Sequence, residues 1–418
     1  MSTLPLPLAL AALLAATPLA AQDVVAYTGA TLWDGTGAPP VERATLVVRG
    51  GRVVAAGRVA PPPGARVEDL SGRWIVPGLI DAHAHVTGRW SRGSRGSAAG
   101  GAAGDLLLFA RYGVTTVASL GGEPEDALAL RRSHDVHALE RARLVLAGPV
   151  ITAGTADEAR AAVRANDALG VDWIKIRVDD NLGTTPKMPA EAVRAVLDEA
   201  HARGLRVATH LFYLDDAKEL LRSGTDLIAH SVRDADVDDE LVELLRQRGV
   251  CYVPTLVREV STFVYADEPD FLEDPFFLAR ADPAELERVR SPEFREEMRD
   301  SPSAARYREA LVQAQENLLR LVEAAIPVAF GTDAGPPARF PGYFEHMELS
   351  LMVEAGLTPE QALRSATGVA ARCLSLDDVG TLEAGKWADF LVLGADPLDR
   401  IENTRALERV YVAGNLVR

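Results

Sequence analysis

An apolar run at residues 76–85, Val-Pro-Gly-Leu-Ile-Asp-Ala-His-Ala-His, ends in the pair His83 and His85. Side chains two apart in a β-strand point to the same face, so the two imidazoles would project together from the end of this strand. Neutral imidazole is the commonest nitrogen ligand of zinc and similar ions. The pair therefore indicates part of a metal site. The alternative interpretation is two polar residues that simply end a strand.

Four more residues of ligand type end strand-like runs: Lys175, His210, His230 and Asp333. In a barrel of parallel strands the functional groups lie at the carboxyl ends of the strands, where these six side chains would converge. The remaining histidines fall on or beside expected helices, where a packed or solvated role is the simpler interpretation: His134, His137, His201 and His346.

The segment 77–376 alternates short apolar strands with amphipathic helices. After the strand that ends at His85, strands are expected at 115–118, 144–147, 171–176, 205–210, 227–230, 250–254 and 328–333. Helices are expected at 157–169, 189–203, 215–223, 237–248 and 305–325. Eight strands that alternate with helices predict an α/β fold of the closed (β/α)8 barrel type.

Both ends of the chain differ from this pattern. Residues 22–76 and 377–418 contain β-branched runs separated by Gly and Pro turns, which predicts one small β-sandwich domain built from both chain ends. Residues 257–304 are rich in Asp, Glu, Pro and Phe, and we expect them to form an insertion that caps the same face of the barrel as the six ligand-type residues.

Length and charge limit the function. The chain has 418 residues, more than the ~250 of a barrel alone. Lys and Arg number 44 against 60 Asp and Glu, a net charge of −16 that argues against nucleic acid or an anionic membrane as a partner. We therefore expect a small-molecule substrate, and the sequence permits a homo-oligomer.

Residues 1–21 are typical of a secretory signal peptide, with a short apolar core and small residues before Gln22. A membrane anchor is the less favoured alternative because the apolar run is short and bounded by prolines. We expect cleavage, a periplasmic or secreted location and no stable membrane insertion of the mature chain. Two cysteines, Cys251 and Cys373, are too few for a disulfide framework in a chain of this size.

Five motifs spread along the chain carry a family resemblance: 76–85, 173–176 (Trp-Ile-Lys-Ile), 331–335 (Gly-Thr-Asp-Ala-Gly), 358–367 and 380–389. On these motifs the chain resembles the metal-dependent amidohydrolase superfamily, in its branch near imidazolonepropionases and Xaa-Pro dipeptidases (prolidases). It differs from many relatives at 177–183, which lacks a Gly-rich segment, and from the prolidase-like relatives at 148–154, which lacks a histidine.

The resemblance implies a site with two divalent ions, with zinc as the first expectation. His83, His85 and Asp333 would hold one ion, and His210 and His230 the other. The resemblance also implies that Lys175 bridges both as a carbamate formed with CO2. The alternative for Lys175 is an ion pair with Asp179 or Asp180.

The implied reaction is hydrolysis of an amide by a hydroxide that bridges the ions, with Asp333 as the proton shuttle. Tyr252 is a candidate for holding the oxyanion or, equally, a core aromatic residue. Arg177 and Arg233 are candidates for binding a substrate carboxylate, as in a dipeptide or an N-acyl amino acid. Each arginine has the alternative of pairing with nearby aspartates, Asp179 or Asp180 for Arg177 and Asp234 or Asp236 for Arg233.

Two further functions remain open. The same pair of ions could serve a lactonase or a phosphotriesterase-like enzyme, because the bimetallic hydroxide also attacks esters. A non-catalytic metal-binding barrel is the alternative from another class, and metal content would separate it from the enzymes.

Overall fold

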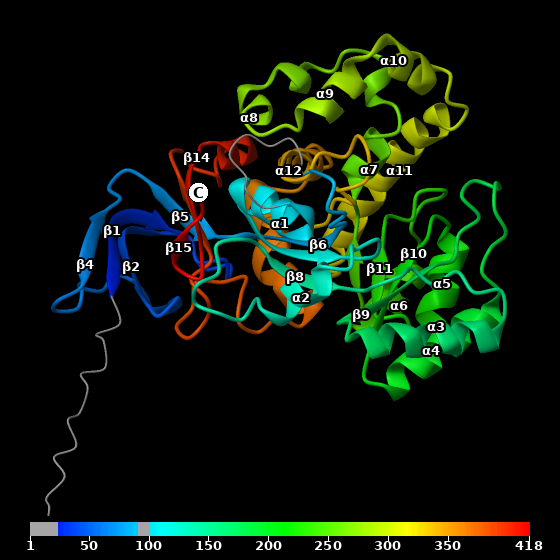
Figure 1. Ribbon diagram of the computed structural model, residues 1–418, viewed down its shortest axis with the longest axis horizontal. Helices are drawn as coiled ribbons and strands as arrows, with labels where there is room; N and C mark the ends of the chain where they lie inside the picture. Colours follow the sequence, from blue (N-terminus) through cyan, green and yellow to red (C-terminus); the bar gives the residue numbers. More distant parts are fainter. Residues whose placement is uncertain (1–23, 91–99) are drawn as a thin grey trace, which may run out of the picture.

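The computed structural model describes residues 24–90 and 100–418 (Figure 1). The expected signal peptide, residues 1–21, lies outside the described residues. In the part of the chain that is described, no helix is both long and apolar enough to cross a membrane.

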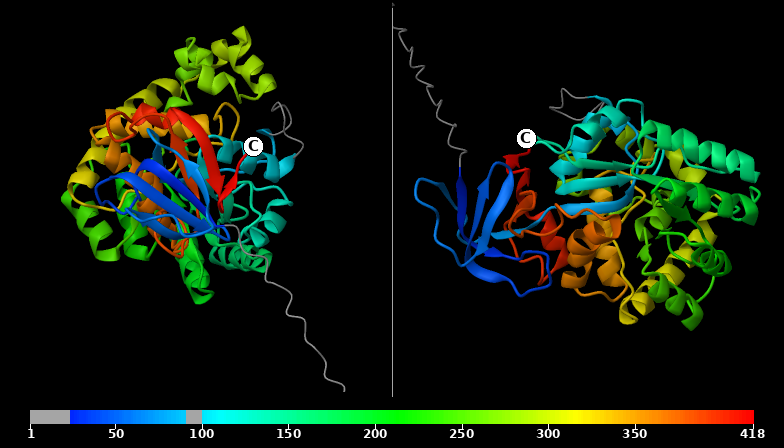
Figure 2. Two further views of the ribbon diagram at one scale, coloured as in Figure 1. Left: turned by 90° about the vertical axis from the view of Figure 1, so that its left-hand side faces the viewer. Right: turned by 90° about the horizontal axis from the view of Figure 1, so that it is seen from below.

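Strands from both ends of the chain share one eight-stranded sheet, which lies at one end of the molecule (Figure 2). Its order is β15-β14-β13-β5-β1-β2-β3, with β4 also paired to β1. The strands are β1 (Val25–Leu32), β2 (Val41–Arg49), β3 (Arg52–Gly57), β4 (Arg66–Asp69), β5 (Trp74–Pro77), β13 (Phe390–Leu393), β14 (Leu407–Val412) and β15 (Asn415–Leu416).

This sheet branches at β1, whose first half pairs with β4 and whose last two residues pair with β5. Its apolar face forms a core separate from that of the rest of the chain. At its centre Tyr27 packs edge-on to Phe390 with ring centroids 5.0 Å apart, and Phe390 stacks on Tyr411 at 4.3 Å. Residues distant in sequence thus hold the two ends together, whereas the two-layer sandwich remains a prediction.

The middle of the chain holds seven strands in two parallel sheets. One sheet is β6 (Leu79–Ala84), β7 (Val114–Ser119) and β8 (Arg143–Leu146), and the other is β9 (Trp173–Arg177), β10 (Arg206–His210), β11 (Leu227–Ala229) and β12 (Cys251–Val253). All neighbouring strands within these sheets run parallel. A mixed α/β fold is confirmed. The bounds of β7 to β12 lie within two residues of the expected ones, whereas β6 is shorter than the strand expected to end at His85.

The expected eighth strand, 328–333, is not a regular strand. It forms a single bridge between Val328 and Tyr252. Farther along, the N–H groups of Thr332 and Asp333 both donate to the carbonyl of His83, at 3.0 and 2.6 Å, so the ladder cannot continue. Asp333 has φ 59°, which turns the chain away. The segment still lies between β6 and β12, but closure of the barrel remains a prediction.

The helices follow the alternation expected from the sequence. They are α1 (Gly101–Arg111), α2 (Ala127–Arg132), α3 (Ala156–Leu169), α4 (Ala190–Ala202), α5 (Leu214–Ser223), α6 (Asp239–Arg248), α11 (Ala304–Glu323), α12 (Tyr343–Glu354), α13 (Pro359–Arg364) and α14 (Ala370–Leu374). A π-helical turn, η4 (Ser365–Val369), joins the last two. Local signals set the ends of α3, which starts with the capping box of Thr155 and Glu158 and stops at Gly170 in the left-handed conformation.

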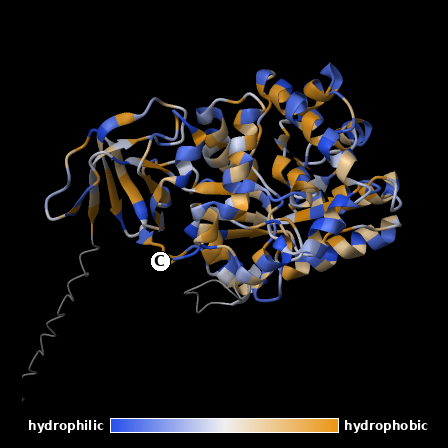
Figure 3. Cartoon of the chain, turned by 90° about the horizontal axis from the view of Figure 1, so that it is seen from above, coloured by the Kyte–Doolittle hydropathy of each residue, from blue (hydrophilic) through white to orange (hydrophobic). Residues whose placement is uncertain are grey.

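Hydropathy explains the layering. In Figure 3 hydrophobic residues line the strands in the interior, and hydrophilic and hydrophobic residues alternate along the outer helices. Such helices bury one apolar stripe against the strands and leave the polar face to water. The strands of the middle sheets are buried on both sides, as β6 and β7 show along their whole length.

The segment 257–304 forms a helical insertion that projects from the body (Figure 1). Its elements are α7 (Leu256–Val260), η2 (Val264–Ala266), η3 (Asp270–Glu273), α8 (Pro275–Leu278), α9 (Pro283–Arg290) and α10 (Pro292–Arg299). Three of these helices begin with an Asp or Ser cap followed by Pro, a typical start signal. Glu285 of α9 accepts a hydrogen bond from the Ala338 N–H at 2.6 Å, which ties the insertion to the loop after Asp333.

A disulfide joins Cys251, at the start of β12, to Cys373 in α14, with the two Cα atoms 5.9 Å apart. The sequence did not predict this bond, because two cysteines in a long chain carry no pairing signal. The bond closes a loop of the chain with a sequence separation of 122 residues.

Candidate active site

The end of β6 and the segment 330–333 place the first ligand group. Ala82 N donates to the carbonyl of Phe330 at 2.9 Å, and His83 O accepts from Asp333 N. These bonds align the two segments side by side, with His83 at the end of β6 and His85 just beyond it. Asp333 therefore faces the two histidines although it lies about 250 residues away in the sequence.

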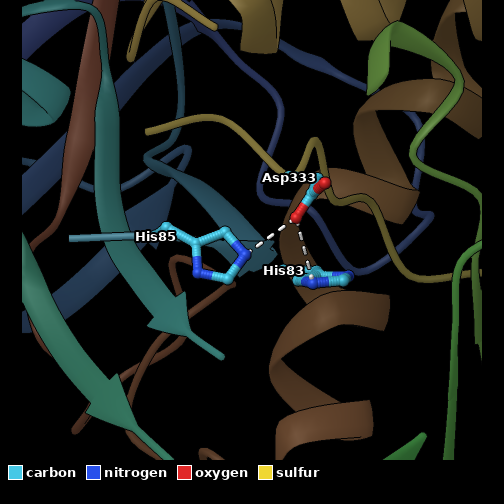
Figure 4. Close-up of side chains that lie close together, drawn as sticks. All are labelled: His83, His85 and Asp333. Atoms are coloured by element: carbon cyan, nitrogen blue, oxygen red, sulfur yellow. Dashed lines mark hydrogen bonds and ion pairs between the residues drawn. The ribbon is translucent and has the colours of Figure 1, made fainter. Parts of the chain in front are cut away.

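His83, His85 and Asp333 form a compact group (Figure 4). Asp333 Oδ1 lies 2.8 Å from His85 Nε2 and 3.4 Å from His83 Nε2, and the ligand atoms of all three lie within 4.8 Å of one another. His85 Nδ1 contacts the carbonyl of Gly121 at 2.6 Å, which fixes Nε2 toward the site. Two nitrogens and one carboxylate oxygen are a donor set that suits zinc.

Lys175, His210 and His230 lie beside this group. Lys175 Nζ is 2.9 Å from His83 Nε2. The ring of His230 is 4.5 Å from that of His83 and 4.2 Å from that of His210, centroid to centroid. Thr255 Oγ1 contacts His230 Nδ1 at 2.7 Å, so Nε2 is left for the site. The six predicted ligand residues therefore meet in one place.

His210 differs from the other members because its Nε2 contacts the carboxylate of Asp179. Asp179 is one of the two residues given above as alternative partners of Lys175. Asp179 Oδ2 lies 3.1 Å from His210 Nε2, and Asp180 accepts a hydrogen bond from the Tyr213 hydroxyl at 2.8 Å. Among the described residues only His83, His85 and Asp333 bring three ligand atoms within 4.8 Å. The ion pair of Lys175 with Asp179 or Asp180 is not observed.

Burial favours the neutral form of four ligand-type residues at the site, His83, Lys175, His210 and His230. Burial lowers the pKa of His83 and His230 well below the ordinary value, and that of His210 to about 4, with nearby cationic groups adding to the effect. Burial also lowers the pKa of Lys175 to about 7, although Asp333 and Glu123 oppose it. Neutral imidazoles and a neutral amine have the lone pairs that a metal ligand or a reaction with CO2 requires.

Asp333 stays ionised in spite of its burial. Desolvation alone would raise the pKa of this carboxyl, but Arg339 and the two histidines lower it well below the ordinary value. Arg339 Nη1 makes a close ion pair with Asp333 Oδ2, while Oδ1 faces His83 and His85. The carboxylate is thus divided between a cation on one side and the ligand group on the other.

Comparison with known proteins decides the family. Residues 74–417 match the family described as "Amidohydrolase family". The chain belongs to this family. It is a hydrolase that acts on carbon–nitrogen bonds.

The amidohydrolase is 26% identical over 414 residues to an imidazolonepropionase of Cutibacterium acnes, which covers 90% of this chain and 91% of the relative. It is 30% identical over 363 residues to an uncharacterised protein of Mycobacterium tuberculosis, covering 82% and 85% of the two chains. Over 208 residues it is 33% identical to an N-acyl-D-aspartate deacylase of Alcaligenes xylosoxydans xylosoxydans, covering 47% of this chain and 38% of the relative. A solved Xaa-Pro dipeptidase with bound methionine is 23% identical, with a TM-score of 0.72 and coverage of 94% and 99%, and shows the shared fold. The predicted superfamily and branch are confirmed.

Two of the three candidates for substrate binding have protein partners in this amidohydrolase. Arg233 is buried, with Nε 3.0 Å from Glu259 Oε1 and Nη1 donating to the carbonyl of Leu211 at 3.0 Å. The expected alternative, a pair with Asp234 or Asp236, is not observed. The hydroxyl of Tyr252 accepts a hydrogen bond from Val232 N at 2.6 Å, and burial raises its pKa to about 12.

Arg177 is half-buried at the carboxyl end of β9. It lines a cavity of about 180 Å³ together with Thr152, Asp179 and Met188. Its Nε atom is buried without a hydrogen bond to any described residue. The roles predicted for Arg177, Arg233 and Tyr252 in substrate binding remain predictions.

Several residues at the site were missed. Asp81 accepts a bond from His83 N at 2.8 Å and from the Thr332 hydroxyl at 2.5 Å, so it joins the two segments that carry the first ligand group. Its position two residues before His83, on the same face of the strand, was the available signal. Asp179 and Arg339 had no such signal, because loops bring them to the site.

Proposed function

We propose that this amidohydrolase binds two divalent ions, with zinc preferred, and hydrolyses the amide bond of a small carboxylate-bearing substrate such as a dipeptide or an N-acyl amino acid. The observation that carries the proposal is the convergence of His83, His85 and Asp333 with the other three predicted ligand residues, Lys175, His210 and His230. Bound divalent ions would polarise the scissile carbonyl and lower the pKa of water.

Asp333 is the proposed proton shuttle. It is ionised, and Oδ1 faces His83 and His85, so it can accept the proton of the attacking water and deliver it to the leaving nitrogen. Lys175 is proposed to react with CO2. The lone pair of Nζ forms a bond to the carbon and the nitrogen releases one proton, which gives an anionic carbamate with two oxygen ligands. Tyr252 is retained as a candidate for the oxyanion site.

The names of the relatives support an amide substrate with an acidic or amino acid part. They include an N-acyl-D-aspartate deacylase and, at the level of the fold, a Xaa-Pro dipeptidase. We further propose that the middle strands form a closed barrel over 77–376, that 22–76 and 377–418 form a composite β-sandwich domain, and that 257–304 caps the site. The disulfide of Cys251 and Cys373 supports the proposed periplasmic or secreted location, because such bonds persist in oxidising compartments.

A substrate panel tests the proposal. Metal-loaded protein is assayed with dipeptides, N-acyl amino acids and lactones, and its metal content is measured. We expect hydrolysis of at least one amide class and about two ions per chain. Turnover of lactones alone would shift the function to ester hydrolysis, and metal content without turnover of any class would favour a binding protein.

A further inference from the structure

Three arginines, Arg233, Arg258 and Arg339, form ion pairs with two carboxylates near the ligand group, Glu259 and Asp333. Glu259 accepts a hydrogen bond from Arg258 and forms an ion pair with Arg233, each at 3.0 Å. Arg339 pairs with Asp333. The nearby carboxylate of Asp179 contacts His210 instead. Asp179 also acts electrostatically on Arg233 beside the neutral His210, so the three guanidinium groups face three carboxylates, those of Glu259, Asp333 and Asp179.

Arg339 is partly buried, so a loss of its counter-charge would be costly without another anion. Glu259 is already shared by two arginines. Asp333 belongs to the ligand group, so its negative charge is also needed by a bound cation. In a protein with a net charge of −16, a cation bound to Asp333 would therefore leave Arg339 with less counter-charge than before.

Exposure separates the three arginines. The Arg233 side chain is 1% exposed, whereas Arg339 and Arg258 are 18% and 11% exposed. Of the three, Arg339 and Arg258 therefore keep access to solvent.

Arg339 also has an unused donor. Its Nε donates to the Ser261 hydroxyl at 3.1 Å and its Nη1 serves Asp333, but Nη2 makes no hydrogen bond with any described residue. Arg258 uses Nη1 for Glu259 and reaches the Tyr307 hydroxyl only at 3.4 Å with Nη2. Both side chains thus keep donor capacity next to the ligand group.

We propose that Arg258 and Arg339 form the subsite that binds the free carboxylate of the substrate. A guanidinium fork binds a carboxylate through two parallel hydrogen bonds, and a substrate anion here would compensate Arg339 when Asp333 serves a bound cation. The inference rests on the proposed function, because it assumes that the substrate binds at the ligand group. It assigns the carboxylate to residues from α7 and from the loop after Asp333.

Binding of a matched acid and amide tests this subsite without relying on turnover. Zinc-loaded protein is titrated calorimetrically with N-acetyl-L-leucine and with N-acetyl-L-leucinamide. We expect the wild type to bind the acid about 10- to 100-fold more tightly, the range for charge-assisted hydrogen bonds. Arg339→Gln and Arg258→Gln should each lose most of this preference, and the affinity for the amide should stay unchanged.

Arg131→Gln is the matched control, because Arg131 pairs with Asp172 away from the ligand group. It should keep the wild-type preference. Arg233→Gln and Arg177→Gln are measured in the same way. If only one of these two variants loses the preference for the acid over the amide, that arginine binds the carboxylate and the proposal is overturned. Zinc content is measured for every variant.

Other outcomes also decide the matter. Equal affinity of the wild type for acid and amide overturns the proposal even if a variant fails to fold. Variants that fold, hold zinc and keep the preference overturn it as well, and would leave Arg339 only the role of orienting Asp333. If the wild type hydrolyses no amide but binds the acid selectively through Arg258 and Arg339, the proposed function fails while the subsite stands.

Discussion

Lys175 Nζ lies 2.9 Å from His83 Nε2, and both side chains are buried, Lys175 in the middle of β9 and His83 next to the last residue of β6. A buried lysine next to a histidine rather than a carboxylate gains no charge compensation from its nearest partner. The contact therefore favours the neutral amine, the form that reacts with CO2, and separates this lysine from the many surface lysines that pair with acids.

Replacing Lys175 tests its role as a ligand. Lys175→Ala should lose at least one of about two bound ions and most activity, because no other described side chain occupies its place between the two ligand groups. Elemental analysis of the purified variant measures this. Lys386→Ala, a change in the eight-stranded sheet region, is the control and should retain metal. Wild-type metal content in Lys175→Ala would contradict the proposal that a carbamate on Lys175 bridges the two ions.

Asp333 is predicted to act as base as well as ligand. Asp333→Asn keeps the shape of the side chain and removes the base, so we expect kcat to fall by about 10² or more with metal largely retained. Steady-state kinetics with one substrate, together with metal analysis, measures both effects. Asp172→Asn is the control at the pair with Arg131. Unchanged turnover in Asp333→Asn would refute the shuttle role.

The buried pair of Arg233 and Glu259 should contribute to stability. Arg233→Met leaves Glu259 with one fewer cation and should lower the free energy of unfolding by about 3 kcal/mol, the lower end for a broken buried pair, because Arg258 remains. Denaturant unfolding measures it. Adding Glu259→Gln should recover part of the loss. The exposed Arg246→Met should change stability by less than about 0.5 kcal/mol.

His346 should make the fold sensitive to acid. Burial lowers its pKa from 6.5 to about 3, although the contact with the Tyr112 carbonyl opposes this shift. Above pH 6.5 the histidine is neutral in both states. As pH falls toward 3 only the unfolded state binds this proton, so stability falls, by up to about 1.4 kcal/mol per pH unit.

Urea unfolding between pH 7 and 4 measures this dependence as the difference between the wild type and His346→Gln, which should be less acid-sensitive by about one proton. The exposed His137→Gln should leave the slope as in the wild type. Identical slopes for wild type and His346→Gln would show that this histidine does not resist protonation.

Processing of the amino terminus tests the proposed location. Protein recovered from its native host should begin at Gln22 or Asp23, after removal of residues 1–21. Mass spectrometry of the intact chain reads this directly. A chain that still carries residues 1–21 would contradict the signal peptide.

Sequence reasoning works best where a residue's role depends on its own strand. Lys175 lies within β9 and His210 ends β10, close to where the apolar runs predict them, and the two strands pair in parallel. The same reasoning missed that 328–333 is not a regular strand, because the turn at Asp333 depends on hydrogen bonds to the distant carbonyl of His83. The periodicity of apolar residues indicates the local preference of a segment for helix or strand. It carries no information about hydrogen bonds to a distant part of the chain.

The polar surroundings of the ligands were the least predictable part. Asp179 lies close to Lys175 in sequence, yet it contacts His210. Arg233 has acidic neighbours in sequence, yet it pairs with Glu259 from α7. The partners of charged side chains in loops depend on how distant segments come together in the folded site. A single sequence does not predict these contacts.

The disulfide between Cys251 and Cys373 has a consequence for proteolysis. The whole helical insertion lies inside the covalent ring that it closes. A single protease cut in the projecting helices would therefore release no fragment, and the nicked molecule would keep its mass, plus one water, until a reductant separated the pieces. The protein would thus remain, after one cut in its most prominent part, a single covalent molecule of two chains.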